Sequence, residues 1–206
     1  GFLQIRNQPL IPKVDKYHIA GGAVASVSKA AYLGYYEVRM KASGISMSST
    51  FWLKNKPANK DCPYEQLELD IVEAVGMQKK GYDFHNFMKR SNAHIFHTDC
   101  EGKKEVKSAP NQAPLNPAVH KAFHTFGCWW VDENTLKFYL DGKYQYTIHP
   151  STHFREKPFD RPMYMHLVTE TYNWEEPPTI EELQNDSINT TYYDWIRSYK
   201  LVKVEP

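Results

Sequence analysis

Hydrophobic and aromatic residues gather in many short runs along the chain, and stretches rich in Pro, Gly, Asn and Asp separate these runs. Runs of this kind, with no helical periodicity between them, predict an all-β sandwich or barrel. The predicted strands are Phe2–Arg6, His18–Val27, Tyr35–Lys41, Ser48–Leu53, Leu67–Val75, Ala93–His97, Phe123–Val131, Leu136–Leu140, Tyr144–Ile148, Met163–Val168 and Tyr192–Val204. No repeat or linker interrupts the series, which predicts a single domain.

Local signals add turns and one short helix to this picture. Asp141-Gly142 stands between two alternating runs and predicts a two-residue hairpin, because a type I′ turn needs positive φ at both central positions. A T-x-x-E capping box that begins at Thr179 predicts a short helical turn. Segments rich in Pro, Asn or Lys are predicted to be surface loops, namely Asn55–Tyr64, Asp99–Pro117 and Pro150–Pro162.

The most informative run is Gln66–Val75, in which acidic side chains alternate with Leu and Ile. On a strand, Glu68 and Asp70 share one face. Strict alternation would turn Glu73 into the core, where an unpaired carboxylate costs several kcal/mol. A β-bulge at Ile71-Val72 resolves this conflict, because one extra residue returns Glu73 to the face of the other two acids.

Three neighbouring carboxyls cannot all ionise cheaply, so one of them is predicted to have a raised pKa while another stays anionic. A protonated carboxyl beside an anionic one is the pair that retaining glycoside hydrolysis uses, at a separation of about 5–5.5 Å. The alternative is a solvated strand face of charges, but such a face usually mixes in Lys or Thr, and this one does not. The pattern therefore favours glycosidase chemistry.

Charge and composition narrow the classes of partner. The chain carries 25 basic and 24 acidic residues, so its net charge does not attract it to a nucleic acid or an anionic membrane. No apolar stretch approaches the roughly 18 residues that a membrane helix needs. Aromatic residues make up 14% of the chain, which suits strands and surfaces that stack on flat ligands.

The three cysteines include no C-x-x-C pair, so neither a zinc knuckle nor a full disulfide framework is indicated. A bridge between Cys62 and Cys100 is one alternative. Three free thiols, with Cys128 in the core, is the favoured interpretation, because buried free cysteine is common. The histidines show no metal-binding spacing, and no transition metal is expected.

The E-x-D-x-x-E strand resembles the signature of glycoside hydrolase family 16. The resemblance covers nearly the whole chain, through the segments Tyr35–Ala42, Ser49–Leu53, Phe123–Trp130, Leu136–Gly142 and Tyr192–Tyr199. It implies a concanavalin A-like β-jelly-roll sandwich of two antiparallel sheets, with a substrate cleft across the concave face. Catalytic domains of this family usually start several tens of residues earlier, so residues 1–206 are expected to form one catalytic domain that lacks its N-terminal strand.

The resemblance also implies roles for the three acids, by their position in the motif. Glu68 would be the nucleophile, Glu73 the acid/base, and Asp70 the residue between them that tunes both. The expected reaction is hydrolysis inside a polysaccharide chain with retention of configuration.

Within the family, the segments Ser48–Leu53, Ser91–His94 and Met165–Glu170 with Trp174 are most similar to the β-agarases and β-porphyranases, which cut red-algal galactans. Glu65 resembles a glutamate of agarases at the spot where porphyranases open a pocket for a sulfate, so it counts as a substrate-binding candidate and favours agarase. The leading hypothesis is an endo-acting β-agarase that cleaves β-1,4 galactosyl linkages. The alternatives are a β-porphyranase, a non-catalytic lectin-like domain and a calcium-dependent adhesion domain.

Tryptophan residues are candidates for stacking on sugar rings. Trp52 follows Phe51, so strand parity sends one to the core and the other to the cleft, and the resemblance favours Trp52 in the cleft. Trp129 and Trp130 face the same choice, and Trp130 is taken as the candidate. Trp174 is predicted to supply a stacking plane at one end of the cleft, with a loop anchor as the alternative.

Polar candidates surround these aromatic residues. His94 is interpreted either as a sugar ligand or as a strand histidine that is hydrogen-bonded in place, and Glu170 either as a hydroxyl acceptor or as a surface charge. A guanidinium binds sulfate with paired donors, which makes Arg90 a candidate for a sulfated sugar. Neighbouring lysines share this assignment, although solvated loop charges are the favoured alternative for the whole set: Lys54, Lys56, Lys60 and Lys89.

The resemblance implies one candidate metal site, for a structural calcium ion at Asp194 on the convex side of the sandwich. Calcium takes six to eight oxygens, and one Asp with backbone carbonyls supplies only part of that shell. The chemistry itself requires no cofactor. Because a polymer cannot enter a cell whole, a secreted, periplasmic or cell-surface-attached monomer is expected, with a polysaccharide as its partner, no nucleic acid and no membrane insertion.

Overall fold

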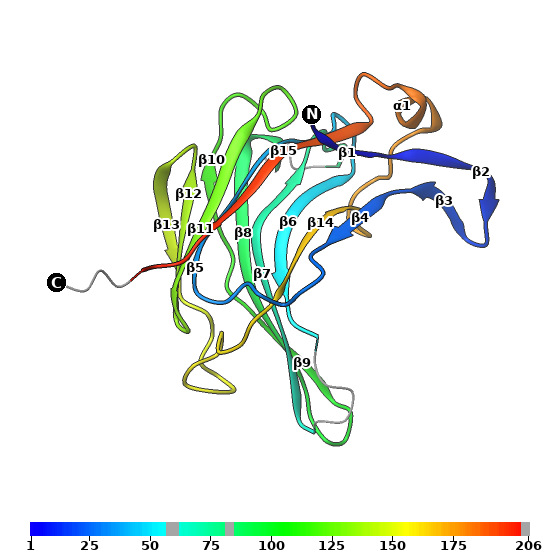
Figure 1. The fold of residues 1–206 in the computed structure, drawn as a ribbon. Helices are drawn as coiled ribbons and strands as arrows, with labels where there is room; N and C mark the ends of the chain where they lie inside the picture. The colour runs from blue at the N-terminus through cyan, green and yellow to red at the C-terminus, as the bar shows by residue number, and fades with distance from the viewer. Residues whose placement is uncertain (57–61, 81–84, 203–206) are drawn as a thin grey trace.

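The computed structural model describes residues 1–56, 62–80 and 85–202, and two antiparallel sheets packed face to face make up most of it (Figure 1). The first sheet has six strands in the order β1-β15-β5-β11-β12-β13. Its strands are β1 (Leu3–Arg6), β5 (Gly34–Lys41), β11 (His124–Asp132), β12 (Thr135–Leu140), β13 (Lys143–Ile148) and β15 (Thr190–Tyr199). The predicted all-β sandwich is confirmed.

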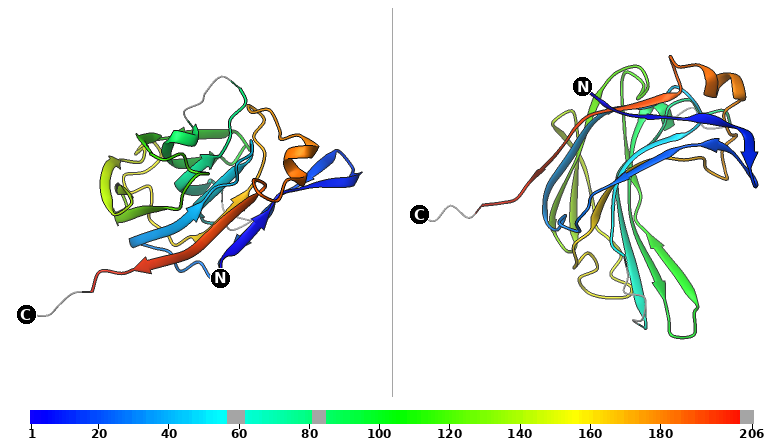
Figure 2. Two further views of the ribbon diagram at one scale, coloured as in Figure 1. Left: turned by 90° about the horizontal axis from the view of Figure 1, so that it is seen from above. Right: turned by 45° about the vertical axis from the view of Figure 1, so that its right-hand side comes forward.

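The second sheet has seven strands in the order β10-β8-β7-β6-β14-β4, with β9 also paired to β8. Its strands are β4 (Gly22–Ala25), β6 (Ser48–Lys54), β7 (Tyr64–Val75), β8 (Met88–Thr98), β9 (Lys104–Ser108), β10 (Asn111–Pro114) and β14 (Tyr164–Thr169). A short 3-10 helix, His85–Phe87, leads into β8. Strands β6, β7 and β8 bend along their length, so this sheet is curved (Figure 2).

The core between the sheets follows from the alternation of apolar residues along the strands. Leu67 and Leu69 of β7 and Phe51 of β6 are fully buried, and they pack in one cluster with Phe126 of β11 and Phe138 of β12. Each such side chain contributes about 1.5–3 kcal/mol when buried. Since the core fixes these inward positions, the polar residues that alternate with them are held on the outer face of the seven-stranded sheet.

The predicted hairpin and the predicted helical turn are both confirmed. Asp141 and Gly142 join β12 to β13 with φ of 48° and 75°. Helix α1, Ile180–Gln184, begins after Thr179, whose side chain accepts a hydrogen bond from the Glu182 amide while the Glu182 carboxylate accepts one from the Thr179 amide. No helix within the described residues is long and apolar enough to cross a membrane.

Within the described ranges, three strands lie outside the predicted set, and the predicted strand His18–Val27 forms two strands instead of one. Strands β2 (Gln8–Val14) and β3 (Tyr17–Ala20) form a hairpin that projects from the body (Figure 2). Strands β9 and β10 fall inside Asp99–Pro117, so the prediction of a loop there is wrong. Strands β2, β9 and β10 are mostly exposed and are polar or carry proline, and therefore lack the buried alternation that marks a strand in sequence. Pro150–Pro162 is a loop as predicted, and the prediction for Asn55–Tyr64 falls partly outside the described residues.

Cys62 and Cys100 form a disulfide, with their Cα atoms 5.1 Å apart. The preference for three free thiols is therefore wrong. The two cysteines meet because β7 and β8 pair along their length, with Tyr64 opposite Thr98, and residue composition does not reveal that pairing. Cys128 is free and buried, as predicted.

Candidate active site

The site begins with a β-bulge in β7. Phe51 of β6 pairs with Val72, and the next residue, Trp52, pairs with Asp70. Ile71 is therefore the extra residue. After it, side chains at odd-numbered positions of β7 take the face that even-numbered positions took before it. The bulge that was predicted at Ile71-Val72 is confirmed.

Because of this bulge, Glu68, Asp70 and Glu73 all face the same side of the sheet. They line one cavity of about 240 Å³ on its outer face. The other lining residues come from β6 and from the position just after β14, and they are Thr50, Trp52, Lys54 and Glu170. Three carboxyls from one strand are thus brought together, as the alternation with Leu and Ile predicted.

Each of the three carboxyls contacts a different partner, so they are not equivalent. The contacts are Lys54 Nζ to Glu68 Oε2 at 2.6 Å, His94 Nε2 to Asp70 Oδ2 at 3.3 Å, and the Tyr172 hydroxyl to Glu73 Oε1 at 3.0 Å. The Lys54 ammonium is thus a direct counter-ion of Glu68. Burial, followed by the charge of Glu73, raises the pKa of Tyr172, so this hydroxyl stays protonated and donates.

The central carboxyl, Asp70, is buried between the other two. Burial raises the pKa of Asp70 to about 7, the charges of Glu73 and Glu68 add to the rise, and the hydrogen bond from His94 opposes it. Burial alone would lower the pKa of His94, but its contact with Asp70 outweighs this and the pKa of His94 is raised. The prediction that one carboxyl of the cluster has a raised pKa is therefore confirmed at Asp70, which can hold a proton near neutral pH.

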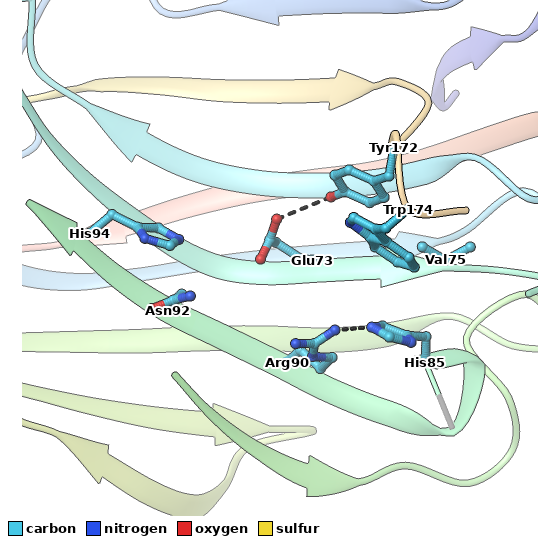
Figure 3. Close-up of a pocket in the computed structure, with 8 residues that line it drawn as sticks. All are labelled: Glu73, Val75, His85, Arg90, Asn92, His94, Tyr172 and Trp174. Carbon is cyan, nitrogen blue, oxygen red and sulfur yellow. Dashed lines mark hydrogen bonds between the residues drawn. The ribbon is translucent and has the colours of Figure 1, made fainter. Parts of the chain in front are cut away.

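A second, larger cavity of about 410 Å³ adjoins the acids (Figure 3). Glu73 lines both cavities, and His94, which contacts Asp70, lines the larger one. Arg90, Asn92 and His94 reach it from β8, while Tyr172 and Trp174 reach it from the loop that follows β14. Val75 and His85 complete its lining.

The larger cavity combines one cation with an aromatic wall. The Arg90 guanidinium is in hydrogen-bond contact with His85. Trp174 is 44% exposed and stacks between Tyr172 and His85, with ring centroids 4.8 and 5.1 Å away. A flat apolar ligand face and an anionic substituent would both find matching surfaces here.

Several predicted binding residues line these cavities. Trp52 is on the cleft side and stacks on His166 with ring centroids 4.3 Å apart, whereas Phe51 is fully buried, so the parity argument is confirmed.

His94 contacts Asp70 and the Ser108 hydroxyl. Glu170 lines the smaller cavity, where burial and the nearby Glu73 and Glu68 raise its pKa. Arg90 and Trp174 share the larger cavity.

Two predicted binding residues lie elsewhere. Trp130 is fully buried between the sheets, edge-on to the rings of Tyr32 and Phe159, so its assignment to the cleft is wrong. Glu65 is also misassigned: it is an odd number of residues before Glu68, so it faces the other side of β7, where its Oε2 lies 2.7 Å from Nε of Arg155. The argument for agarase that used Glu65 loses its basis.

The lysines of this group that the structure describes do not form a sulfate site with Arg90. Lys89 is fully buried, Lys54 is paired with Glu68, and Lys56 lies over the ring of Tyr164. Lys60 falls outside the described residues. Arg90 is therefore the basic side chain of this set that faces the larger cavity.

The surroundings of Asp194 do not fit a calcium ion. Its Oδ2 lies 2.5 Å from Nη1 of Arg39, which already neutralises the carboxylate. Among the described residues, a group of three possible metal ligands occurs at Glu68, Asp70 and His94, away from Asp194. The calcium expectation for Asp194 is not supported.

Four residues of the site escaped the sequence analysis, namely His85, Asn92, His166 and Tyr172. Tyr172 carried a detectable signal, because it stands two residues before Trp174 in the same loop. His85 and His166 carried none, since their place depends on how β14 and the 3-10 helix pack beside β6 and β8.

Comparison with known proteins agrees with this geometry. Residues 1–201 match the family model described as beta-porphyranase A-D, GH16 domain. Beta-porphyranase E of Zobellia galactanivorans is 64% identical over the whole chain, which spans 73% of that relative, and beta-porphyranase B of Phocaeicola plebeius is 45% identical, with 72% of it spanned. The crystal structure of a β-porphyranase from the gut bacterium Bacteroides plebeius superimposes with a TM-score of 0.92 at 46% identity, covering 99% of this chain and 77% of that one.

These matches confirm the jelly-roll architecture and the resemblance to glycoside hydrolase family 16. They also identify a glycoside hydrolase that acts on red-algal galactan, and they do not support the lectin-like alternative. The chain belongs to the GH16 glycoside hydrolases, in the family of β-porphyranase A–D domains.

Proposed function

We propose that the chain is an endo-acting, retaining β-porphyranase, which hydrolyses galactosyl linkages of a sulfated red-algal galactan. The observation that carries this proposal is the position of Arg90 in the cavity next to the three acids, beside the aromatic face of Trp174. The similarity to β-porphyranases supports it. The sequence-based preference for agarase is therefore replaced by its alternative.

In the proposed reaction, Glu68 attacks the anomeric carbon as Glu73 donates its proton to the departing glycosidic oxygen. This gives a covalent glycosyl ester on Glu68 and a free hydroxyl on the leaving sugar. Glu73, now anionic, takes a proton from water, whose oxygen attacks the anomeric carbon and releases Glu68. Two inversions give net retention, and no cofactor enters either step.

Each neighbouring side chain has a defined part in this reaction. Lys54 orients Glu68 through its 2.6 Å contact. The Tyr172 hydroxyl orients Glu73. Asp70, with its raised pKa, can hold a proton between the two outer acids, which lowers the negative charge of the cluster by one.

Specificity is assigned to Arg90 and Trp174. A sulfate ester offers its oxygens to the paired donors of a guanidinium, as a phosphate does, while the sugar ring stacks on the indole. An uncharged galactan would bury the Arg90 charge without a counter-ion, which disfavours it. The same residues therefore select for the sulfated polymer and against agarose.

The test is digestion of porphyran, agarose, carrageenan and laminarin in parallel by the wild type and by Arg90→Met. Loss of a charge-assisted contact of about 2 kcal/mol corresponds to roughly a 30-fold fall in kcat/KM on porphyran. Arg197→Met is the control, because Arg197 stacks on Trp195 in the other sheet. Equal or faster cleavage of agarose by the wild type would make the protein an agarase instead.

The remaining features of the proposal follow from the size of the substrate. A polysaccharide is cleaved outside the cytoplasm, so we place the protein in the secreted, periplasmic or surface-attached fraction. One chain supplies all the groups that the reaction uses, which fits a monomer. Activity that persists in excess chelator is expected, since no metal takes part.

A further inference from the structure

The bulge in β7 leaves one backbone carbonyl without a ladder partner. Pairing between β7 and β8 runs from Tyr64 opposite Thr98 to Asp70 opposite Asn92, and stops there. The next carbonyl, that of Ile71, points into the interior instead. It accepts two side-chain hydrogen bonds from β8, each of 2.8 Å, one from Lys89 Nζ and one from Ser91 Oγ.

These donors form a closed network with a third residue. Ser91 Oγ uses its single proton on the Ile71 carbonyl, and it accepts hydrogen bonds from Lys89 Nζ at 2.9 Å and from the Tyr146 hydroxyl at 3.0 Å. Each of the three side chains therefore donates within the cluster, and a buried polar network that is connected in this way rigidifies its surroundings.

Lys89 is an unusual residue for this position. Its side chain is 0% exposed, and its Nζ lies 4.8 Å from the ring centre of Phe138 and 5.6 Å from that of Tyr146. Within the described part of the chain it pairs with no carboxylate, and burial lowers its pKa to about 7. Burying an amine without a carboxylate partner lowers the stability of the fold, so we expect its contacts with the bulge to have a role that offsets this cost.

We propose that Lys89, Ser91 and Tyr146 are positioning residues that clamp the Ile71 carbonyl and so fix the bulge that sets Glu73 beside Glu68. Only Val72 separates Ile71 from Glu73, so a change of the bulge would move that carboxyl relative to the nucleophile. A displacement of about 1 Å can cost two powers of ten in rate. The proposal rests on the catalytic roles proposed for Glu68 and Glu73.

The same stretch of β8 also faces the larger cavity. Lys89 and Ser91 point inward, whereas Arg90 and Asn92, which alternate with them, line the cavity. Because Lys89 and Ser91 are held against the bulge, the position of Arg90 in the larger cavity is fixed as well. The clamp links the catalytic strand to the specificity residue.

The test uses Lys89→Met, which keeps the length of the side chain and removes the amine, together with Ser91→Ala and Tyr146→Phe. The matched control is Leu136→Ala, because Leu136 is fully buried in the same core and lies outside the network. Kinetic constants on porphyran, the pH profile of kcat and the melting temperature are measured for each. We expect kcat to fall about 10- to 100-fold in Lys89→Met with KM changed less than about threefold, and a shifted pH profile.

A residue that is merely structural would lower the melting temperature and leave both the pH profile and kcat of the folded fraction unchanged, as expected for Leu136→Ala. That result for Lys89→Met would overturn the proposal. If Lys89→Met does not fold, Ser91→Ala decides, and Ser91→Thr, which restores a hydroxyl, must recover kcat. Retained activity in Glu68→Gln or Glu73→Gln would contradict the proposed function itself, independently of the clamp.

Discussion

The hydroxyl of Tyr172 lies 3.0 Å from Oε1 of Glu73, although the two residues come from a loop and from a strand 99 positions apart. This contact joins the wall of the larger cavity to the catalytic strand (Figure 3). The side chain that stacks with Trp174 thus also orients one of the acids.

Replacement of Tyr172 by Phe keeps the stacked ring and removes this hydrogen bond. Because a hydrogen bond to a carboxyl is worth about 1.5–3 kcal/mol when one partner is charged, we expect kcat on porphyran to fall roughly 10- to 100-fold with little change in KM. Tyr32→Phe is the control, since its hydroxyl contacts Glu133 in a different part of the chain. Equal kcat for the wild type and Tyr172→Phe would show that the contact has no role in turnover.

Glu68→Gln removes the proposed nucleophile with almost no change in shape. Turnover is expected to fall by at least about four powers of ten, while binding of porphyran oligosaccharides, measured by calorimetry, remains within about tenfold of the wild type. Lys54 loses its ion-pair partner in this variant, which accounts for a modest change in affinity. More than about one per cent of residual activity would refute the role of Glu68.

The raised pKa of Asp70 predicts how stability depends on pH. In the folded protein this carboxyl binds a proton up to about pH 7, whereas its ordinary value is 3.8, so between these limits the folded state holds more protons than the unfolded state. This site's contribution to the free energy of unfolding therefore decreases as pH rises from about 4 to 7.

Asp70→Asn should remove this contribution, along with that of His94, whose pKa Asp70 raises. Urea unfolding at pH 4.5, 5.5, 6.5 and 7.5 (roughly spanning the window) measures the difference between the variant and the wild type. The variant should gain relative stability as pH rises. A difference that is constant with pH would contradict the raised pKa.

The disulfide between Cys62 and Cys100 predicts a stability effect separate from catalysis. It closes a loop of sequence separation 38, and such a bridge is typically worth about 2–4 kcal/mol. The double variant Cys62→Ser, Cys100→Ser should lose that much in the free energy of unfolding and keep its kcat at 25 °C. Thiol titration of the unfolded wild type should show one free cysteine, Cys128, and three free thiols would contradict the bridge.

The features that follow from local pattern were the ones that sequence predicted well. Glu73 would have been buried without a bulge, so the chemistry of one residue located an irregularity in the strand. Asp141-Gly142 needed positive φ, which fixed the hairpin. In both cases a single local conformation satisfies the residues involved.

Features that depend on packing between distant elements could not be predicted in this way. Trp130 and Trp52 each follow another aromatic residue, yet Trp130 cannot reach the acids on either face of its strand, because β11 belongs to the other sheet. The cavity around Arg90 combines β8 with the loop after β14, and these elements do not pair with each other. The orientation of Glu65, by contrast, follows from strand alternation with Glu68 and could be read from the sequence.

The most direct test of the account is the configuration of the first product. If the bulge sets Glu73 beside Glu68 as acid and nucleophile, proton NMR within the first minutes of porphyran digestion should show the β-anomer at the new reducing end, followed by slow mutarotation to the α-anomer. Immediate appearance of the α-anomer would mean inversion at the anomeric carbon, and it would contradict the covalent role of Glu68.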